Sequence, residues 1–509
     1  MKQKQPPVWW LILLLAILKF LLPFLLRSPV YELQRDEFLY FMQGQHPALG
    51  YLENPPLLSW MATISSWLGG GENWVRFWPS LIGAFTLIFT CLITAELGGR
   101  TFAQLLAGIA ITTGAFLRTH ALFQPNILDI LSWTSSVYFL LCFLRSQQTS
   151  QLIALAISLS LGFYGKYSIA FFAAALFIAL LISAQRKILF QKRVYMALLL
   201  AVVIILPNIY WQYLHNWPLV HHMEELRETQ LKYVNKMDFI KEQFLMTLPV
   251  LFVWIGGLIW LLKNAAWRFL GYTYFFVILL LILGSGKSYY ALGIYPMLFA
   301  AGAVAWQQWT VKLKWLQPVL MIIIIGMTRL ILPMALPIYE PTKLAAVYKK
   351  YNIKHKWEDQ QEHPLPQDFA DMLGWKELTA KAASFFNSLP DSVKNNTNIY
   401  CGNYGQAGAL QFYEKDELFK KKVMSFNGSF LLWIPGNIRF KNLLLISEQM
   451  PGNDEELFQH FKRTTLVDSV TNTYSRQLGN KIIFYEQADE KANELFYTAF
   501  MKKKKLFSR

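Results

Sequence analysis

Residues 7–26 read PVWWLILLLAILKFLLPFLL and carry a single charge, Lys19. About 20 apolar residues are needed for a helix to cross the hydrocarbon core of a bilayer, so this stretch predicts a membrane-spanning helix. Lys19 and Pro23 interrupt it and no small-residue cleavage site follows, which favours a retained helix over a cleaved signal peptide. Ten further apolar runs follow, roughly at 74–97, 102–117, 127–144, 152–164, 168–184, 195–213, 245–262, 269–283, 291–309 and 315–333.

The charges divide the chain into two parts. Residues 339–509 are one third of the 509 residues, yet they hold 44 of the 80 Lys, Arg, Asp and Glu side chains. We therefore expect a polytopic α-helical membrane domain over residues 1–338, with about 11 transmembrane helices, and a soluble domain over residues 339–509. The three cysteines, Cys91, Cys142 and Cys401, are too few and too scattered for a disulfide framework or a CxxC metal site.

The basic residues of the membrane part predict its orientation. When the loops are assigned alternately to the two sides, Arg100, Arg145, the cluster Arg186–Arg193 and Lys263 fall on one side, which the positive-inside rule makes cytoplasmic. Eleven crossings then place residues 339–509 on the outside. Much of the net charge of +16 is thus explained by basic residues in the cytoplasmic loops, which set the orientation. We therefore expect no nucleic-acid partner.

Acidic residues gather on the external side. Of the 12 in the membrane part, five lie in the first external loop, residues 27–73, and five more lie in the fourth, residues 214–244. The first loop is also rich in Trp, Tyr, Leu and Pro, and its residues 57–68 have the pattern of an amphipathic interfacial helix. We expect this loop to pack on the membrane face and to carry the chemistry.

Three short patterns contain the candidate acids. They are RDEFLY at 35–40, with Asp36, Glu37 and Tyr40; YLENPPL at 51–57, with Glu53 and Asn54; and QPNILD at 124–129, with Asp129. An ionisable residue at membrane depth predicts function by default, although Asp129 could instead cap the helix that it opens. The first two patterns lie in the external loop, and the third begins the fourth apolar run.

Two external lysines complement these acids. Lys166 lies in YGKY at 164–167, and Lys287 lies in GSGKSYY at 284–290, followed by Tyr289 and Tyr290. A lone lysine at this depth is usually a snorkelling anchor, but two of them opposite several acids fit a lipid-phosphate site better. The sequence GKS imitates a nucleotide-binding loop, yet Leu281 stands where that motif requires its first glycine, so we reject ATP binding.

Metal binding is left open by the sequence. The fourth external loop contains His215, His221 and His222, and Glu53 or His221 could serve as ligands of a divalent metal ion. Their spacing matches no zinc signature, so no cofactor is assigned.

The order of these motifs resembles that of the bacterial glycosyltransferase family 39, which is similar to protein O-mannosyltransferases and lipid A aminoarabinose transferases. The motifs that carry the resemblance are Asp36-Glu37, Glu53-Asn54-Pro55-Pro56-Leu57, Asp129, Gly165–Ser168, His215–Pro218, Gly286–Tyr290, Leu365–Trp375 and Gly402–Leu410. The resemblance implies a GT-C fold and an external active site whose catalytic aspartate matches Asp36. The aminoarabinose transferases have a lysine where this chain has Asn54, so contact with the carrier phosphate would fall to Lys166 or Lys287.

The resemblance implies transfer of a sugar from a polyprenyl-phosphate donor to an acceptor on the periplasmic face of a bacterial inner membrane. The acceptor, a hydroxyl or phosphate, would belong to a glycolipid, a surface glycan or a protein. A single displacement with Asp36 as general base would invert the anomeric centre. Glu37 and Asp129 would assist Asp36, while Glu53, Asn54, Tyr40, Lys166, Lys287, Tyr289, Tyr290 and His215 would bind substrate. The rival hypothesis is a lipid-linked sugar transporter or flippase, but the chain has no internal repeat and its ionisable residues gather at one face.

The soluble part reads as α/β. Short apolar strands are expected at 398–401, 442–446 and 481–485, and helices at 368–389 and 455–462. The segment NYGQAG at 403–408 reads as a strand-to-helix turn. Two glycines in one turn could bind an anion or a sugar, but a plain structural turn is the favoured interpretation.

Overall fold

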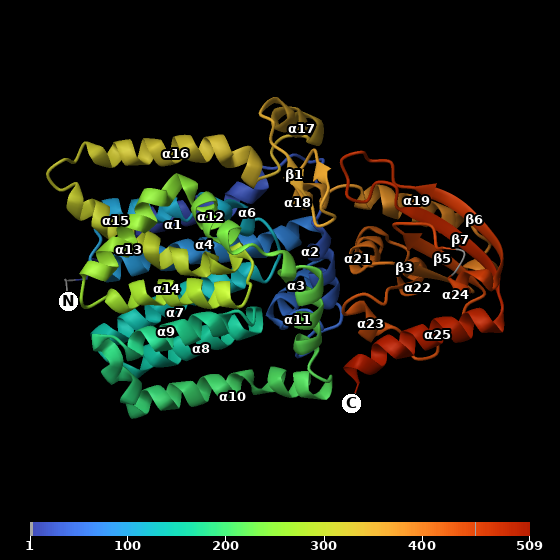
Figure 1. Cartoon of the computed structure of the whole chain (residues 1–509), viewed down its shortest axis with the longest axis horizontal. Helices are drawn as coiled ribbons and strands as arrows, with labels where there is room; N and C mark the ends of the chain where they lie inside the picture. The colour runs from blue at the N-terminus through green and yellow to red at the C-terminus, as the bar shows by residue number, and fades with distance from the viewer. Residues whose placement is uncertain (1–3, 453–454, 509) are drawn as a thin grey trace.

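The computed structural model describes residues 4–452 and 455–508. Long helices lie side by side in a bundle, and a mixed sheet with its own helices sits against one end of it (Figure 1). The start of the chain lies at the opposite end of the bundle. Between the bundle and the sheet lie α2 (Arg35–Gln43), α3 (Leu57–Trp67) and α11 (Pro218–Thr229), so the external loops form a layer between the two parts.

Most predicted apolar runs coincide with a helix or a bent pair of helices, but the run at 102–117 is split, because α5 ends at Ala110 and residues 111–114 are not helical. Within residues 4–452 and 455–508, five helices are long and apolar enough to cross a membrane by length and composition, and the number rises to as many as seven if each bent pair counts as one span. The five are α4 (Glu72–Glu96), α7 (Asn126–Ser146), α10 (Lys192–Leu214), η4 with α15 (Ser288–Trp309) and α16 (Leu316–Ala335). The bent pairs are α9 (Ile169–Leu181) with η1 (Ala184–Phe190) and α12 (Lys236–Met246) with η3 (Leu248–Val250) and α13 (Leu251–Lys263).

Four shorter apolar helices complete the bundle. They are α1 (Trp9–Leu25), α5 (Thr101–Ala110), α8 (Thr149–Gly165) and α14 (Arg268–Leu283). With fewer than 18 residues each, they fall short of a full span by length, so the predicted count of about 11 crossings is not established. Short α6 (Ala115–Thr119) follows α5, and η2 (Leu231–Tyr233) follows α11.

Small residues allow the bundle helices to approach closely. A side chain at Gly302 of α15 would collide with the carbonyl of Val253 on α13, and one at Gly257 would collide with the carbonyl of Leu298. Small residues at helix contacts are the usual device in membranes, where no hydrophobic effect drives helices together. These glycines explain why α13 and α15 pack along most of their length.

The C-terminal part contains a five-stranded sheet of order β4-β3-β5-β7-β6. Its strands are β3 (Thr397–Cys401), β4 (Val423–Met424), β5 (Asn442–Ser447), β6 (Phe461–Ser469) and β7 (Lys481–Ala488). Strand β3 pairs in parallel with β4 and β5, whereas β7 runs antiparallel to β5 and β6. The three predicted strands are present as β3, β5 and β7, and β6 was missed because its residues alternate between exposed and half-buried.

Helices cover both faces of this sheet. α19 (Trp375–Ser388) and α21 (Tyr404–Tyr413) pack on one face, and α25 (Glu490–Lys504) packs on the other. The predicted helix at 368–389 is broken in the structure into α18 (Gln367–Ala370) and α19, which begins after Gly374 with a φ of 86°. The predicted helix at 455–462 is only α24 (Glu456–Gln459), because β6 begins at Phe461. The remaining elements are α17 (Pro341–Lys350), β1 (His355–Lys356), β2 (Glu362–His363), α20 (Asp391–Lys394), α22 (Glu417–Lys422), α23 (Phe430–Trp433) and η5 (Lys505–Phe507).

The first external loop and the sheet part share a single hydrophobic core. Phe38 and Phe41 of α2 are buried in the same cluster as Trp375, Ala407 and Leu410. The Phe38 ring meets the Trp375 ring edge to face at 5.4 Å between centroids. The loop is thus held between the bundle and the sheet rather than lying free in solvent.

Candidate active site

Helix α2 fixes the Asp36-Glu37 pair. Its N-terminus is closed by a capping box in which the Gln34 side chain accepts from the Asp36 amide (2.8 Å) and Glu37 Oε2 accepts from the Gln34 amide (2.8 Å). The other oxygen of Glu37 accepts from the Phe123 amide (2.7 Å), and its side chain is only 1% exposed. Burial raises the pKa of Glu37. Both Glu37 oxygens are therefore engaged by the backbone, and the residue holds α2 in place.

Asp36, unlike Glu37, does not have both carboxylate oxygens bonded within the described part of the protein. Its Oδ1 accepts a hydrogen bond from the Tyr404 hydroxyl (2.7 Å) and lies 3.5 Å from Arg35 Nε. Within residues 4–452 and 455–508, Oδ2 has no hydrogen-bond partner, and the side chain is 27% exposed. Asp36 thus combines a fixed orientation with one carboxylate oxygen that is open to a substrate.

Tyr404 reaches Asp36 because α21 packs directly on α2. Asn403 begins α21 with a capping box, in which its side chain accepts from the Gln406 amide (3.0 Å). A side chain at Gly408 would approach the backbone of Phe38, and one at Gly405 would meet the Arg35 side chain at 2.5 Å. Gly405 and Gly408 therefore allow α21 to pack closely against α2. This agrees with the interpretation of the NYGQAG segment as a structural turn rather than a ligand-binding one.

The contact between Tyr404 and Asp36 can be tested by substitution. We expect Tyr404→Phe to lower kcat about tenfold with little change in the midpoint of thermal unfolding, because a hydrogen bond to a charged group contributes about 1.5–3 kcal/mol and packing of the ring is kept. Steady-state kinetics measures the effect. Tyr497→Phe, on exposed α25, is the matched control and should match wild type. Equal kcat values for the two variants would show that the hydroxyl does not orient Asp36.

Glu53 connects the loop to the sheet part. Its Oε1 accepts from the Ser429 amide (2.6 Å), and its Oε2 accepts from the Ser429 hydroxyl (2.5 Å) and from Gln43 Nε2 (3.1 Å). Burial raises the pKa of Glu53, and the Ser429 hydrogen bonds partly oppose this shift. Asn54 is buried and bonds with Gln43 and the Pro55 carbonyl. The Glu53 carboxylate and the Asn54 amide, both predicted to bind substrate, are therefore already hydrogen-bonded within the protein.

Asp129 lies deep in a fixed network. Its two oxygens accept from Trp133 Nε1 (2.7 Å) and from the Ser168 hydroxyl (2.8 Å), and the residue is only 3% exposed. It does not cap α7, whose cap position is Pro125. The hydrogen bond from Ser168 to Asp129 joins α7 to the turn before α9, so Asp129 fixes these two elements relative to each other.

Lysines and tyrosines form the membrane side of the site. Lys166 Nζ donates to Asn126 Oδ1 (2.7 Å) and lies 3.8 Å from the Tyr290 ring centroid. Tyr289 meets Tyr290 edge to face at 4.9 Å, and its electrostatic neighbours include Tyr40 and Asp36. The sequence patterns of the first loop, the YGKY turn and the GSGKSYY turn are thus brought to one place.

Lys287 and the histidines lie along the fourth external loop. Lys287 Nζ donates to Gln230 Oε1 (2.5 Å). His215 stacks on Trp211 with centroids 4.0 Å apart and bonds its carbonyl, while His221 lies near Glu224 (3.8 Å). Both oxygens of Glu53 accept hydrogen bonds from Ser429 or Gln43. In the described part of the chain, no three His, Cys, Asp or Glu side chains are grouped to hold a metal ion.

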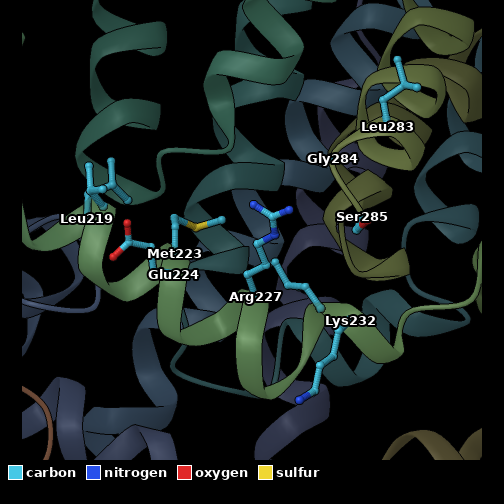
Figure 2. Close-up of a pocket in the computed structure, with 10 residues that line it drawn as sticks. Leu219, Met223, Glu224, Arg227, Lys232, Leu283, Gly284 and Ser285 are labelled. Carbon is cyan, nitrogen blue, oxygen red and sulfur yellow. The ribbon is translucent and has the colours of Figure 1, made fainter.

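A pocket of about 880 Å³ opens beside this loop, between α11, η2 and the turn after α14. Figure 2 shows the Arg227 guanidinium pointing into the hollow toward Leu283–Ser285, whereas the Lys232 ammonium points the other way. Leu219, Val220 and Met223 add apolar surface. The pocket lining combines Arg227, Lys232 and Glu224 with an apolar wall, and its turn leads directly to Lys287.

Sequence reasoning missed Tyr404, Ser429 and Arg227. Tyr404 lies in a motif that was noted, yet nothing local links it to a residue 368 positions earlier. Ser429 carries no pattern at all. Arg227 lies among acids and histidines in the fourth external loop, and no local pattern distinguishes it there.

Comparisons with known proteins give relatives in sequence and in fold. The family profile described as dolichyl-phosphate-mannose-protein mannosyltransferase matches residues 53–211. The lipid A galacturonosyltransferase RgtD of Rhizobium johnstonii is 27% identical over 231 residues, which cover 43% of this chain and 47% of that protein. The chain thus spans about half the length of the curated relative that it matches.

The fold resembles that of ArnT from Cupriavidus metallidurans. The crystal structure of ArnT bound to undecaprenyl phosphate is similar with a TM-score of 0.62 and 13% identity, over 94% of this chain and 97% of that one. The apo structure gives a TM-score of 0.61 with 12% identity and the same coverage. At this identity the likeness concerns the fold, and it extends over both the bundle and the sheet part.

Proposed function

We propose, from the premise that this chain is a membrane glycosyltransferase of the GT-C type, that it transfers a sugar from a polyprenyl-phosphate donor to an acceptor hydroxyl or phosphate. In this proposal Asp36 is the base that activates an acceptor hydroxyl. The observation that carries the proposal is the contrast among four acids. The oxygens of Glu37, Glu53 and Asp129 are all engaged, whereas Asp36 keeps one oxygen open. A general base must reach the proton that it removes, and among these four acids the open oxygen of Asp36 supports its assignment as the base.

The donor side of the proposal rests on charge and shape. A sugar joined to a lipid phosphate already has a stable leaving group, so the enzyme gains most by stabilising the negative charge that the leaving group develops. Lys166 lies 3.8 Å from the Tyr290 ring centroid, and Lys287 stands two residues before Tyr289 in the chain. The hollow beside Arg227 has the apolar wall that an isoprenoid chain requires. Undecaprenyl phosphate is also the lipid bound to the fold relative ArnT.

The proposed step is a single displacement. The acceptor oxygen forms a bond to the anomeric carbon while the bond from that carbon to the phosphate oxygen breaks. The acceptor proton passes to Asp36, and polyprenyl phosphate leaves with both electrons of the broken bond. Such a displacement inverts the anomeric centre. No metal ion is needed to balance the step.

The location follows from the charge distribution. The basic loops favour a cytoplasmic position for the end of the bundle remote from the sheet. Asp36 and the sheet part would then face the periplasm of a bacterial inner membrane. Because the lipid donor and the acceptor would meet at that surface, no water-soluble sugar nucleotide is required.

The decisive experiment is transfer by the purified chain. Radiolabelled sugar on polyprenyl phosphate is incubated with an extract of membrane glycolipids and envelope glycans, with and without the protein, and labelled product is separated from donor. Enzyme-dependent labelling supports transfer. Absence of labelling with every donor, together with scrambling of labelled lipid between leaflets of proteoliposomes, would favour the transporter or flippase hypothesis.

The pocket beside α11 supplies a separate test of donor binding. We expect Arg227→Gln to raise the KM for the donor about fivefold without changing kcat, because a basic side chain near a membrane surface contributes about 1 kcal/mol toward an anion. In the described residues Arg227 forms no ion pair, so its charge is available. Lys241→Gln, on α12 and paired with Asp238, is the matched control. If the two variants bind donor equally well, the phosphate lies elsewhere.

A further inference from the structure

A second pocket lies in the C-terminal part, away from the membrane face. It has a volume of about 360 Å³ and is bounded by the segment around Trp357 and His363, the loop after β5 and the loop between β6 and β7. Three of its lining residues are aromatic, namely Trp357, His363 and Tyr474. Nothing in the proposed reaction uses these side chains.

Ring stacking and ion pairs fix several of the side chains that line or border this pocket. The Trp357 and His363 rings are stacked at 3.4 Å between centroids with 8° between their planes, and His363 Nε2 pairs with Asp359 (2.8 Å). Arg476 is fixed between Glu358 (3.0 Å) and Asp371 (3.3 Å). The lining is therefore held in position before any ligand arrives, which lowers the entropic cost of binding.

Residues at two walls of this pocket lie near the groups that surround Asp36. Glu358 and Asp371, the two partners of Arg476, are also electrostatic neighbours of Arg35, which lies beside Asp36. On the opposite wall, Glu448 lies 3.5 Å from Asn403, the residue before Tyr404. A molecule in the pocket would thus sit next to the segments that orient Asp36.

The chemistry of the lining selects one class of ligand. The C–H face of a sugar ring packs on aromatic side chains, and its hydroxyls bond to planar amides and carboxylates such as those of Gln449, Glu448 and Asn480. The one arginine in the lining is already neutralised by two carboxylates, so a phosphate would find no unpaired guanidinium. We propose that this pocket binds a hexose or hexosamine unit of the acceptor, an inference that rests on the proposed transfer reaction.

Binding can be tested without catalysis by saturation-transfer difference NMR. The probes are a β-linked glucosamine disaccharide, maltose and glucosamine 6-phosphate, each added to full-length protein in detergent. We expect saturation transfer to at least one neutral or amino sugar, and a loss of at least fivefold in Tyr474→Ala and Gln449→Ala. The control Tyr497→Ala lies in a different hollow and should keep the wild-type signal.

The conservative variant Tyr474→Phe preserves the ring and should retain most of the signal, which separates ring packing from misfolding. Signals that persist in Tyr474→Ala, or no signal with any sugar in wild type, would overturn the proposal, as would a preference for glucosamine 6-phosphate. In the transfer assay we expect Tyr474→Ala to raise the KM for the acceptor about tenfold with kcat and the donor KM unchanged. If the protein binds sugar but catalyses no transfer, the proposed reaction is contradicted while the proposed sugar-binding pocket is supported.

Discussion

Asp36→Asn should lower kcat by about a hundredfold to ten-thousandfold, because an amide oxygen cannot take up the proton of an acceptor hydroxyl. The change keeps the shape of the side chain, and its oxygen can still accept from the Tyr404 hydroxyl. We therefore expect α2 to stay in place and the thermal midpoint to shift little. Single-turnover kinetics with labelled donor would measure the chemical step separately from binding and product release.

The control for this variant is Asp391→Asn, an almost fully exposed aspartate in the sheet part, which should behave as wild type. Glu37→Gln provides the contrasting result. It would disturb a buried residue that accepts from two backbone amides, so its main effect should be a lower thermal midpoint. Retention of more than a tenth of wild-type kcat in Asp36→Asn would refute the assignment of the base.

Gly428→Val should lower the free energy of unfolding by about 3 kcal/mol and abolish most activity. Gly428 has a φ of 62°, a conformation that β-branched residues strongly avoid, and a side chain there would collide with Glu53 Oε1. The collision would separate Glu53 from Ser429 and thereby detach the first external loop from the sheet part. Thermal unfolding followed by aromatic fluorescence, with kcat measured in parallel, tests both consequences.

Gly436 supplies the matched substitution. It also lies in a loop of the sheet part, but among the described residues no atom lies within 4 Å of where its side chain would begin. Gly436→Val should therefore leave stability and turnover close to wild type. Equal behaviour of the two valine variants would show that the contact between Glu53 and Ser429 does not hold the site together.

The sequence predicted the helical bundle well because apolar runs of membrane length carry a strong and local signal. The number of crossings was harder to predict, because α5 and α8 are shorter than a span and the runs at 168–184 and 245–262 are bent. The amphipathic pattern at 57–68 was also sufficient to predict α3. Helix α19 was placed too early because the break at Gly374 depends on a left-handed backbone rather than on hydrophobicity.

The sequence singled out several acids that the fold brings near one another, but not their hydrogen-bond partners. Charge and position identified Asp36, Glu37, Glu53 and Asp129, and all four lie at or near the junction of the bundle with the sheet part. What sequence could not reveal is which oxygens remain open, since that depends on the Phe123 amide for Glu37 and on Ser429 for Glu53. Those partners lie 86 and 376 residues away along the chain. Hydrogen bonding over such separations has no local pattern.

The shared core of α2 and α21 also bears on how the protein is made. Tyr404 and Ser429 are synthesised after every apolar helix of the bundle, yet they orient Asp36 and hold Glu53. Translation and membrane insertion of the bundle can therefore be finished while the acid remains unaligned. Asp36 and Glu53 would reach the geometry described above only after the last third of the chain has been synthesised and has folded onto the loop.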